Sequence, residues 1–308
     1  MADLEPQSSR TADTVVAIDG LVKHYGKVEA VRGIDLQVAR GEVFGFLGPN
    51  GSGKSTTIRC LLGLLRPTAG LIGAFGLDAT RDGVAMRRRL TYVPGELRLP
   101  DRLTGMELAT SFGHLRGGFD TTRRDQLAER LRLDLHRRLR DLSSGNRRKV
   151  ALLLAFLFDA ELIVLDEPTN GLDPLMQREF LAMVREARAA GATVFLSSHS
   201  LSEVQRAADR VAILRAGKLV AQGTVAELRG RARQRIEVWF EEDPPEAQLK
   251  ALPGMVDPVV DDHRFTATLS GSIQPLIGLL ASHRVGSMLV EEPDLEEAFL
   301  DLYDGEPS

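Results

Sequence analysis

The stretch Gly48-Pro49-Asn50-Gly51-Ser52-Gly53-Lys54-Ser55 decides the fold. It matches the phosphate-loop pattern G-x-x-x-x-G-K-[ST], in which glycines let the backbone curl around phosphate oxygens. The apolar run Val43–Leu47 before it predicts a strand, and Thr56–Leu65 after it predicts a helix. Strand, loop and helix together direct backbone N–H groups and the positive end of a helix to one point. We therefore predict a nucleotide site, with Lys54 on the β- and γ-phosphates and Ser55 on magnesium.

A second apolar strand ends in two carboxylates. Leu162–Leu165 is followed directly by Asp166 and Glu167. Ligands gather at the carboxyl ends of strands in open α/β sheets, so Asp166 is expected near the magnesium that Ser55 holds. Neighbouring strand residues point in opposite directions, which predicts that Asp166 supports the metal and Glu167 acts as general base for the attacking water. The alternative is that both carboxylates cap the next helix.

Short apolar runs alternate with amphipathic helical runs, which predicts an α/β fold with strands and covering helices. Between Glu96 and Ala160 the sequence indicates helices only, so a helical subdomain over about 96–160 interrupts the sheet. Its helices are Thr104–Leu115, Thr121–Leu131 and a long one from about Ser144. The candidate strands are Val15–Ile18, Gly33–Val38, Val43–Leu47, Leu71–Ala74, Leu90–Val93, Leu162–Leu165, Thr193–Ser197 and Arg210–Arg215.

The element order changes after Gly230. Residues 231–308 predict a βαββαβ order, which is typical of a small ferredoxin-like α+β domain. A disordered N-terminus (1–13), a nucleotide-binding domain (14–230) and this small accessory domain (231–308) form the expected plan. The predicted C-terminal elements are strand Arg235–Glu241, helix Glu246–Leu252, strands near Pro258–Val260 and at Arg264–Leu269, helix Ile273–His283, strand Ser287–Glu291 and helix Leu295–Tyr303.

Composition limits the classes of protein that this chain can belong to. Its 308 residues suffice for about two domains. The net charge of −4 disfavours a dedicated nucleic-acid binder, and basic excess in residues 1–230 against acidic excess in 231–308 suggests two modules. The single cysteine, Cys60, excludes an internal disulfide and a cysteine-rich zinc site. The longest apolar run, Val150–Phe158, is too short to cross a bilayer.

The stretch Leu142-Ser143-Ser144-Gly145-Asn146 opens the long helix with a Ser/Gly turn, which is a second anion-binding turn. A phosphate loop combined with such a turn in a helical insertion resembles the ATP-binding subunit of an ABC transporter. The five residues are similar to the family signature LSGGQ, with Ser144 and Asn146 as departures that keep hydroxyl and amide chemistry. The resemblance covers roughly residues 14–228 and implies a P-loop ATPase core with a mixed sheet and a helical subdomain.

The resemblance also implies roles for single residues. Tyr25 matches the aromatic side chain that stacks on adenine, with His24 as the alternative. Asp173 matches the loop that joins two ATP sites across a dimer, and His199 is similar to the histidine that contacts the γ-phosphate. The implied ATP-binding residues are Tyr25, Gly48, Pro49, Asn50, Gly51, Ser52, Gly53, Lys54, Ser55, Thr56, Glu96, Ser143, Ser144, Gly145 and Asp173. The implied catalytic residues are Glu167, His199 and Lys54, and the implied magnesium ligands are Ser55, Asp166 and Glu96.

One family motif departs more strongly. Where the family carries Gln after a Tyr-x-Pro turn, this chain reads Tyr92-Val93-Pro94-Gly95-Glu96. Glycine has no side chain to ligate magnesium, so either Glu96 takes over or the role is lost. We predict that Glu96 takes over, because a carboxylate can bind the metal directly or through water.

The resemblance implies hydrolysis of ATP with Mg²⁺ at a site shared by two chains, of which a symmetric homodimer is the simplest form. Since no span crosses the bilayer, transport requires separate integral-membrane permease subunits, which would hold the chain at the cytoplasmic face of the membrane. The segment Gly217–Leu228 and the small C-terminal domain are similar to drug and antibiotic exporters, which predicts export of a drug, antibiotic or lipid-like substrate.

Two other functions stay open at this stage. One is a soluble ABC ATPase that acts on ribosomes or DNA, although no second cassette or long coiled-coil insertion is present; we expect no nucleic-acid partner. The other is a regulatory nucleotide-binding module with little turnover, which the departures at Gly95 and Ser144 favour. The C-terminal domain either stabilises a dimer or senses a ligand. Heterodimers and import are alternatives to homodimers and export.

Overall fold

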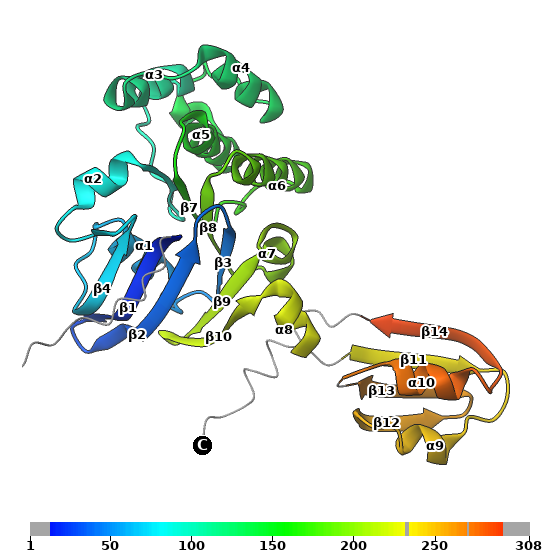
Figure 1. The fold of residues 1–308 in the computed structure, drawn as a ribbon. Coiled ribbons are helices and arrows are strands. Elements are labelled where there is room, and N and C mark those ends of the chain that lie inside the picture. Colours follow the sequence, from blue (N-terminus) through cyan, green and yellow to red (C-terminus); the bar gives the residue numbers. More distant parts are fainter. Residues whose placement is uncertain (1–12, 232–233, 270, 292–308) are drawn as a thin grey trace, which may run out of the picture. The chain divides into compact units, whose positions relative to one another are not determined.

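The computed structural model describes residues 13–231, 234–269 and 271–291. The chain divides into two compact units, and the division along the chain falls between Gln222 and Gly223. Figure 1 shows the elements of both units. Apart from Asp13, the predicted disordered segment 1–13 lies outside the described residues, as does the predicted helix Leu295–Tyr303.

The strands of the N-terminal unit form two sheets. The first is antiparallel, in the order β2-β1-β4-β5, and contains the predicted strands Val15–Ile18, Gly33–Val38 and Leu71–Ala74. Buried and exposed residues alternate along much of β2, as expected for a strand with one face on the core. The bounds are β1 (Thr14–Tyr25), β2 (Val28–Ala39), β4 (Ala69–Ala74) and β5 (Leu77–Asp78).

The second sheet has the order β10-β9-β3-β8-β7-β6, with parallel pairing from β9 through β6. Its strands β3, β7 and β8 are buried along their whole length, because parallel strands covered on both faces read as continuous apolar runs. The bounds of β3, β6 and β9 agree with the sequence prediction. The bounds are β3 (Val43–Leu47), β6 (Leu90–Val93), β7 (Leu162–Asp166), β8 (Thr193–Ser198), β9 (Arg210–Arg215) and β10 (Lys218–Thr224).

Residues 96–160 contain helices and one isolated β-bridge, which confirms the predicted helical subdomain. Thr104 starts its first helix with a capping box to Glu107. The subdomain comprises α3 (Gly105–Arg116), α4 (Thr121–Arg130), the 3₁₀ turn η1 (Leu139–Asp141) and α5 (Ser144–Leu157). The remaining helices of the unit are α1 (Lys54–Leu61), α2 (Gly83–Arg88), α6 (Pro174–Ala189) and α7 (Leu201–Ala207).

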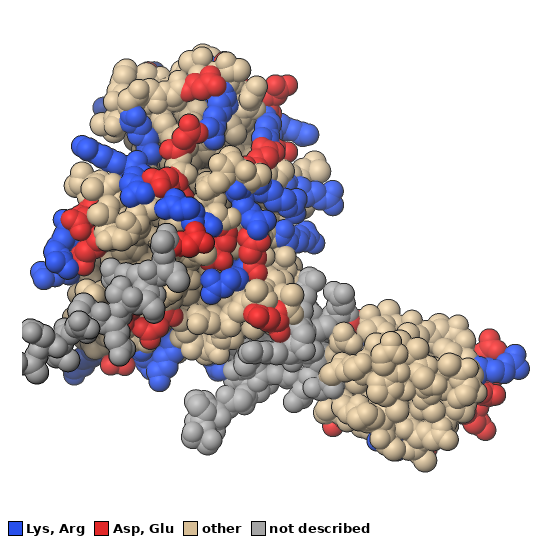
Figure 2. All heavy atoms as spheres, viewed as in Figure 1, with Lys and Arg blue, Asp and Glu red and all other residues tan. Residues whose placement is uncertain are grey.

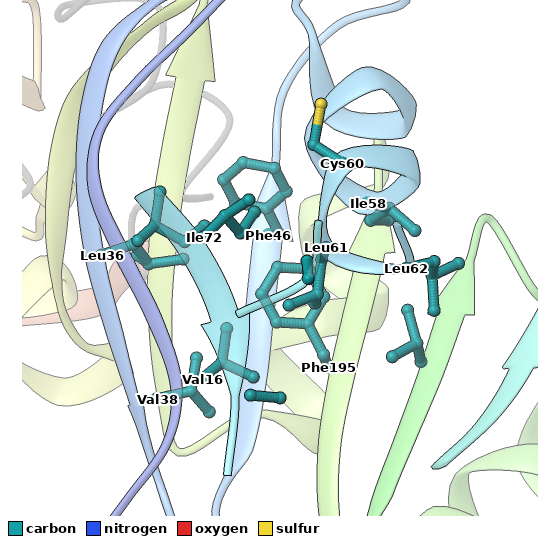
Figure 3. Packing of buried hydrophobic residues seen from close by; sticks show 14 of the residues in the cluster. Val16, Leu36, Val38, Phe46, Ile58, Cys60, Leu61, Leu62, Ile72 and Phe195 are labelled. Atoms are coloured by element: carbon teal, nitrogen blue, oxygen red, sulfur yellow. The ribbon is translucent and has the colours of Figure 1, made fainter. Parts of the chain in front are cut away.

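The core of the N-terminal unit joins both sheets through α1 (Figure 3). Ile58 and Leu61 of this helix pack in the same cluster as Val16 and Phe195, which belong to the two different sheets. Cys60 is fully buried here as a small apolar side chain. The apolar residues of α1 thus pack against both sheets, and this packing fixes the helix that follows the phosphate loop.

The C-terminal unit has the predicted βαββαβ order, preceded by one short helix. Its antiparallel sheet, in the order β12-β13-β11-β14, is that of a ferredoxin-like domain. Alternate residues of β11, including Ile236 and Val238, join Leu249 of α9 and Leu276 of α10 in a separate core. The bounds are α8 (Val225–Arg231), β11 (Gln234–Phe240), α9 (Glu246–Lys250), β12 (Met255–Asp261), β13 (Arg264–Leu269), α10 (Gln274–Leu280) and β14 (Val285–Glu291).

Lys and Arg alternate with Asp and Glu on the visible face of the N-terminal unit (Figure 2). Positive charge is therefore not concentrated in one uniform surface on this face. Arg89 pairs with Glu161 at 2.6 Å, whereas Arg148 is buried. In the part of the chain that the structure describes, no helix has the length and apolar character needed to span a membrane.

Candidate ATP-binding and hydrolysis site

The phosphate loop connects β3 to α1, as predicted. A Cβ atom on Gly48 would lie 2.2 Å from the carbonyl oxygen of Leu214, and one on Gly53 would lie 2.5 Å from that of Ala30. Gly53 also has a φ of +112°, which side chains disfavour. It is the N-cap of α1, and no side chain caps this helix end. The loop therefore presents uncapped N–H groups at the positive end of a helix, an arrangement suited to phosphate.

Lys54 lies folded against this loop. Its ammonium donates hydrogen bonds to the carbonyl oxygens of Gly48, at 2.5 Å, and Pro49, at 3.2 Å. Glu167 Oε1 lies 3.2 Å from the same ammonium, and Lys54 is only 5% exposed. The cation is thus positioned by backbone and carboxylate oxygens inside the loop.

Asp166, the last residue of β7, and Glu167, the residue after it, point to different partners, as predicted. Asp166 Oδ1 accepts a hydrogen bond of 2.6 Å from the Ser197 hydroxyl. Glu167 has a φ of +50°, and its N–H donates to the carbonyl oxygen of Ser197 at 3.1 Å. This turn directs the Glu167 carboxylate to His199, whose Nδ1 lies 2.6 Å from Oε2. Glu167 therefore bridges Lys54 and His199.

Sheet register explains why these residues meet. In the parallel pairing, Leu47 of β3 is opposite Ser198 of β8, and Asp166 of β7 is opposite Ser197. The carboxyl ends of three strands thus lie at one edge of the sheet, where ligands of such sheets bind.

A hydrogen-bond network holds the segment that carries His199. The Ser198 hydroxyl donates to Glu203 Oε2 at 2.8 Å and accepts from the N–H of Ser200. Burial raises the pKa of the Glu203 carboxyl. His199 and Glu203 line a cavity of about 300 Å³ together with Gly171, so the segment around Asp173 approaches the histidine.

The signature turn forms a second cluster. Ser143 is the N-cap of α5, and its hydroxyl accepts from the N–H of Asn146 at 3.2 Å. A Cβ on Gly145 would lie 2.7 Å from the carbonyl oxygen of Gly171, so this turn packs against the loop before α6. Asp173 caps α6 by accepting from two backbone N–H groups at 3.0 Å. Among the described residues, no hydrogen bond or ion pair joins this cluster directly to the phosphate loop.

Gly95, where the sequence departs from the family pattern, lies beside Asp166. A Cβ on Gly95 would lie 3.2 Å from Asp166 Oδ2, whereas Glu96 is exposed. The neighbouring Tyr92 is half-buried, and burial together with the Asp166 charge raises its pKa to about 12. The backbone of Gly95, rather than the Glu96 side chain, therefore faces Asp166.

Tyr25 is 45% exposed at the end of β1, and the ammonium of Lys23 lies 5.3 Å from the centre of its ring. It pairs with Val28, two residues before Ala30, whose carbonyl oxygen faces Gly53. The ring therefore ends a hairpin that approaches the phosphate loop. His24 lies next to it, with Nε2 3.5 Å from the Glu29 carboxylate.

Sequence reasoning missed three residues of this site. Ser197 orients Asp166, Glu203 binds Ser198, and Arg148 of α5 is 7% exposed and donates to two carbonyl oxygens of the loop at Gly95. The strand-end motif Leu196-Ser197-Ser198-His199 contained the signal for Ser197. Arg148 carries no such signal, because it belongs to the basic run Arg147-Arg148-Lys149 and such runs usually form a solvated helix face.

The donor set suits magnesium bound together with a nucleotide. The Ser55 hydroxyl and the Asp166 carboxylate supply hard oxygen ligands, while the described residues contain no group of three or more His, Cys, Asp or Glu able to hold a metal. Ser52 Oγ is buried without a hydrogen-bond partner. Magnesium usually takes its remaining ligands from water and substrate phosphates, and this loop is built to hold phosphates.

A phosphate loop, a carboxylate pair at the end of a buried parallel strand and a histidine just after the neighbouring strand define a P-loop ATPase. The family model described as "ABC transporter" matches residues 31–170. The chain is 36% identical to the daunorubicin resistance ATP-binding protein DrrA3 of Streptomyces coeruleorubidus, over 94% of this chain and 96% of that protein. The chain therefore belongs to the family of ABC transporter ATP-binding proteins, which confirms the predicted family and class of enzyme.

Other similar proteins agree with this assignment. The bacitracin transport ATP-binding protein BcrA of Bacillus licheniformis is 30% identical over 95% of this chain and 98% of its own length. A solved structure titled as the ATP binding subunit of an ABC transporter superposes with a TM-score of 0.65 at 31% identity. It covers 70% of this chain and 92% of that one. These relatives are ATP-binding proteins of drug resistance and antibiotic transport, in line with the predicted function.

Proposed function

We propose that this chain hydrolyses ATP as the motor subunit of a drug or antibiotic efflux transporter. The observation that carries the proposal is the Glu167 carboxylate, which lies 3.2 Å from Lys54 and 2.6 Å from His199 beside the phosphate loop. A base, a cation for phosphate and a histidine are thus assembled at one edge of the sheet.

The proposed reaction uses these groups in turn. Glu167 accepts a proton from water, and the water oxygen attacks the γ-phosphorus as the bond to the bridging oxygen breaks and ADP leaves. Lys54 shifts from its loop carbonyls to the phosphate oxygens and stabilises their negative charge. His199 keeps Glu167 oriented through the 2.6 Å contact and donates to the γ-phosphate.

Magnesium would be held by Ser55 and Asp166, and it would supply positive charge to the phosphates. We propose Glu96 as a further ligand through water, since its exposed side chain follows the loop that packs on Asp166. Magnesium titration of hydrolysis in Glu96→Ala checks this: an unchanged magnesium requirement would remove Glu96 from the ligand set.

Two copies of the chain would form the working unit. ATP-binding subunits of this family dimerise and work with membrane permeases. The signature turn and the phosphate loop form separate clusters in one chain, which supports a site completed by Ser143, Ser144 and Gly145 of a second copy. A symmetric homodimer closes two such sites at once.

Separate permease subunits would hold this dimer at the cytoplasmic face of the membrane and carry the substrate. The roles of the relatives in daunorubicin resistance and bacitracin transport support a drug, an antibiotic or a lipid-like compound as cargo. Coupling is checked by purifying the chain with its permease and measuring drug-stimulated hydrolysis.

The central experiment compares Glu167→Gln with wild type in size-exclusion chromatography and phosphate release. Glu167→Gln should bind ATP and form a stable dimer, with hydrolysis reduced by roughly a hundredfold or more, since a positioned general base contributes about 10²–10⁴-fold. Lys54→Ala serves as the matched control, because it should lose both the ATP-induced dimer and hydrolysis. A Glu167→Gln chain that stays monomeric at saturating ATP would contradict the two-chain site.

A low-turnover regulatory module is the second candidate. Gly95 in place of the family Gln, and Ser144 in place of a signature glycine, favour it. Wild-type turnover that does not respond to any permease, together with ATP-dependent dimerisation, would support this alternative.

A further inference from the structure

Arg148 occupies an unusual place for a charged residue. It lies in the second turn of α5, one helical turn after Ser144, and is 7% exposed. A buried guanidinium needs polar partners, since an unsatisfied buried charge is costly. Its partners are two backbone carbonyls: Nη1 donates to Pro94 and Nη2 to Gly95, each at 2.6 Å. The planar fork of arginine thus grips two consecutive peptide groups, which lysine cannot do in the same way.

The backbone that Arg148 binds lies against Asp166, the carboxylate proposed to hold magnesium. A Cβ on Gly95 would lie 3.2 Å from Asp166 Oδ2 and 3.4 Å from its Cγ, so little space separates this backbone from the carboxylate. On its other side, Asp166 is held by the Ser197 hydroxyl at 2.6 Å. Burial lowers the pKa of the Arg148 guanidinium, and the negative charges of Asp166 and Glu167 oppose that lowering.

We infer that Arg148 is a positioning residue that fixes the backbone of Pro94 and Gly95 against Asp166 and so ties the signature helix to the magnesium site. The inference rests on the proposed function for the roles of Asp166 and the signature turn. In this chain the Arg148 guanidinium holds the loop backbone at Gly95, the position where the family carries a glutamine side chain. In the proposed dimer, Ser144 of one chain contacts the nucleotide held by the other chain. Arg148, one turn further along α5, then connects this contact to Asp166 of its own chain.

The first arm of the test needs no nucleotide. Cleavage by trypsin after Arg98, an exposed residue of this loop, is compared between wild type, Arg148→Gln and Lys149→Gln. Lys149→Gln is the matched control, because it removes one positive charge from the adjacent position of the same helix. Loss of the two hydrogen bonds should speed this cleavage about tenfold in Arg148→Gln alone, since cleavage requires local opening of the loop. Equal cleavage rates in both variants would overturn the inference.

The second arm measures binding of fluorescent ATP as magnesium is titrated. Arg148→Gln should raise the magnesium concentration for half-maximal effect about tenfold, the size typical of residues that orient metal ligands. Binding of ATP in EDTA should stay within about twofold, because the phosphate loop is intact. A magnesium requirement equal to wild type, or a matching shift in Lys149→Gln, would overturn the inference.

Two further variants keep the test decisive if Arg148→Gln fails to fold. Arg148→Lys keeps the charge but cannot bind both carbonyls, so it should show an intermediate magnesium shift. Gly95→Ala places a Cβ 3.2 Å from Asp166 Oδ2 and should raise the magnesium requirement with Arg148 in place. If wild type binds ATP with magnesium but never hydrolyses it, the proposed function fails while both arms still decide the role of Arg148.

Discussion

The first turns of α1 and α5 are both Ser/Gly turns proposed to bind phosphate, yet they are built differently. The N-cap of α1 is Gly53, whose φ is +112°, and no side chain caps this helix end. The N-cap of α5 is Ser143, whose hydroxyl accepts from the N–H of Asn146. The first helix end therefore has no internal partner for its donors, whereas the second satisfies one of them within the chain.

This difference indicates a division of labour. The uncapped end of α1, with Lys54 folded into its loop, is suited to hold a nucleotide in a single chain. The capped end of α5 packs on Gly171 and is suited to complete a site that another chain has already filled. Binding of ATP should therefore depend on α1, and dimerisation with hydrolysis should depend on α5.

Gly53→Ala should give the largest effect. The added Cβ would lie 2.5 Å from the carbonyl oxygen of Ala30, at a φ that side chains disfavour. A cost of about 2 kcal/mol corresponds to roughly a 30-fold loss of ATP affinity, measured with fluorescent ATP on the single chain. Gly51→Ala is the comparison, because its Cβ would meet nothing within 4 Å. Equal losses in both variants would show that backbone strain alone, without the clash, sets the effect.

Gly145→Ala should separate the two helix ends. Its Cβ would lie 2.7 Å from the carbonyl oxygen of Gly171, so the signature turn must shift. Affinity of the single chain for ATP should stay within about twofold, while hydrolysis falls by about tenfold or more through lost dimer formation. Analytical ultracentrifugation with ATP, beside a phosphate-release assay, measures both. A comparable loss of ATP affinity would break the division of labour.

Ser143→Ala should give the smallest of the three effects, which is a loss of folding stability. Loss of the cap on α5 costs about 1 kcal/mol of unfolding free energy, measured by urea denaturation. Asp120→Ala is a matched control, since Asp120 caps α4 in the same way and lies outside the proposed site. Both variants should lose similar stability, but only Ser143→Ala should lose hydrolysis. Equal rates of hydrolysis in the two variants would mean that Ser143 only stabilises α5 and has no role at the ATP site.

Strands with a clear local sequence pattern were predicted correctly from the sequence. The bounds of β3, β6, β9 and β13 agree with the sequence prediction. The division of the N-terminal strands between two sheets was not predicted, because strand partners are set by contacts between distant residues. β10 and α7 were not predicted either; the apolar run of β10 is short, Leu219–Ala221, and α7 is only seven residues long.

The sequence motifs predicted the chemistry of the site, but they did not predict its geometry. Motif spacing placed Lys54, Glu167 and His199 at one site, and they lie together. The contact of Gly95 with Asp166 was not foreseen, and neither was the burial of Arg148, because each depends on a segment more than 50 residues away.

The sequence by itself determined the ATPase class, because the phosphate loop, the Asp166–Glu167 pair and the signature turn carry their chemistry in residue type and spacing. Only the tertiary structure decided which groups touch. Parallel register brings Asp166 beside Ser197, and the packing of α5 buries Arg148 against Pro94 and Gly95. The reason is physical: residue type sets what a group can bind, whereas burial and register set what lies within its reach.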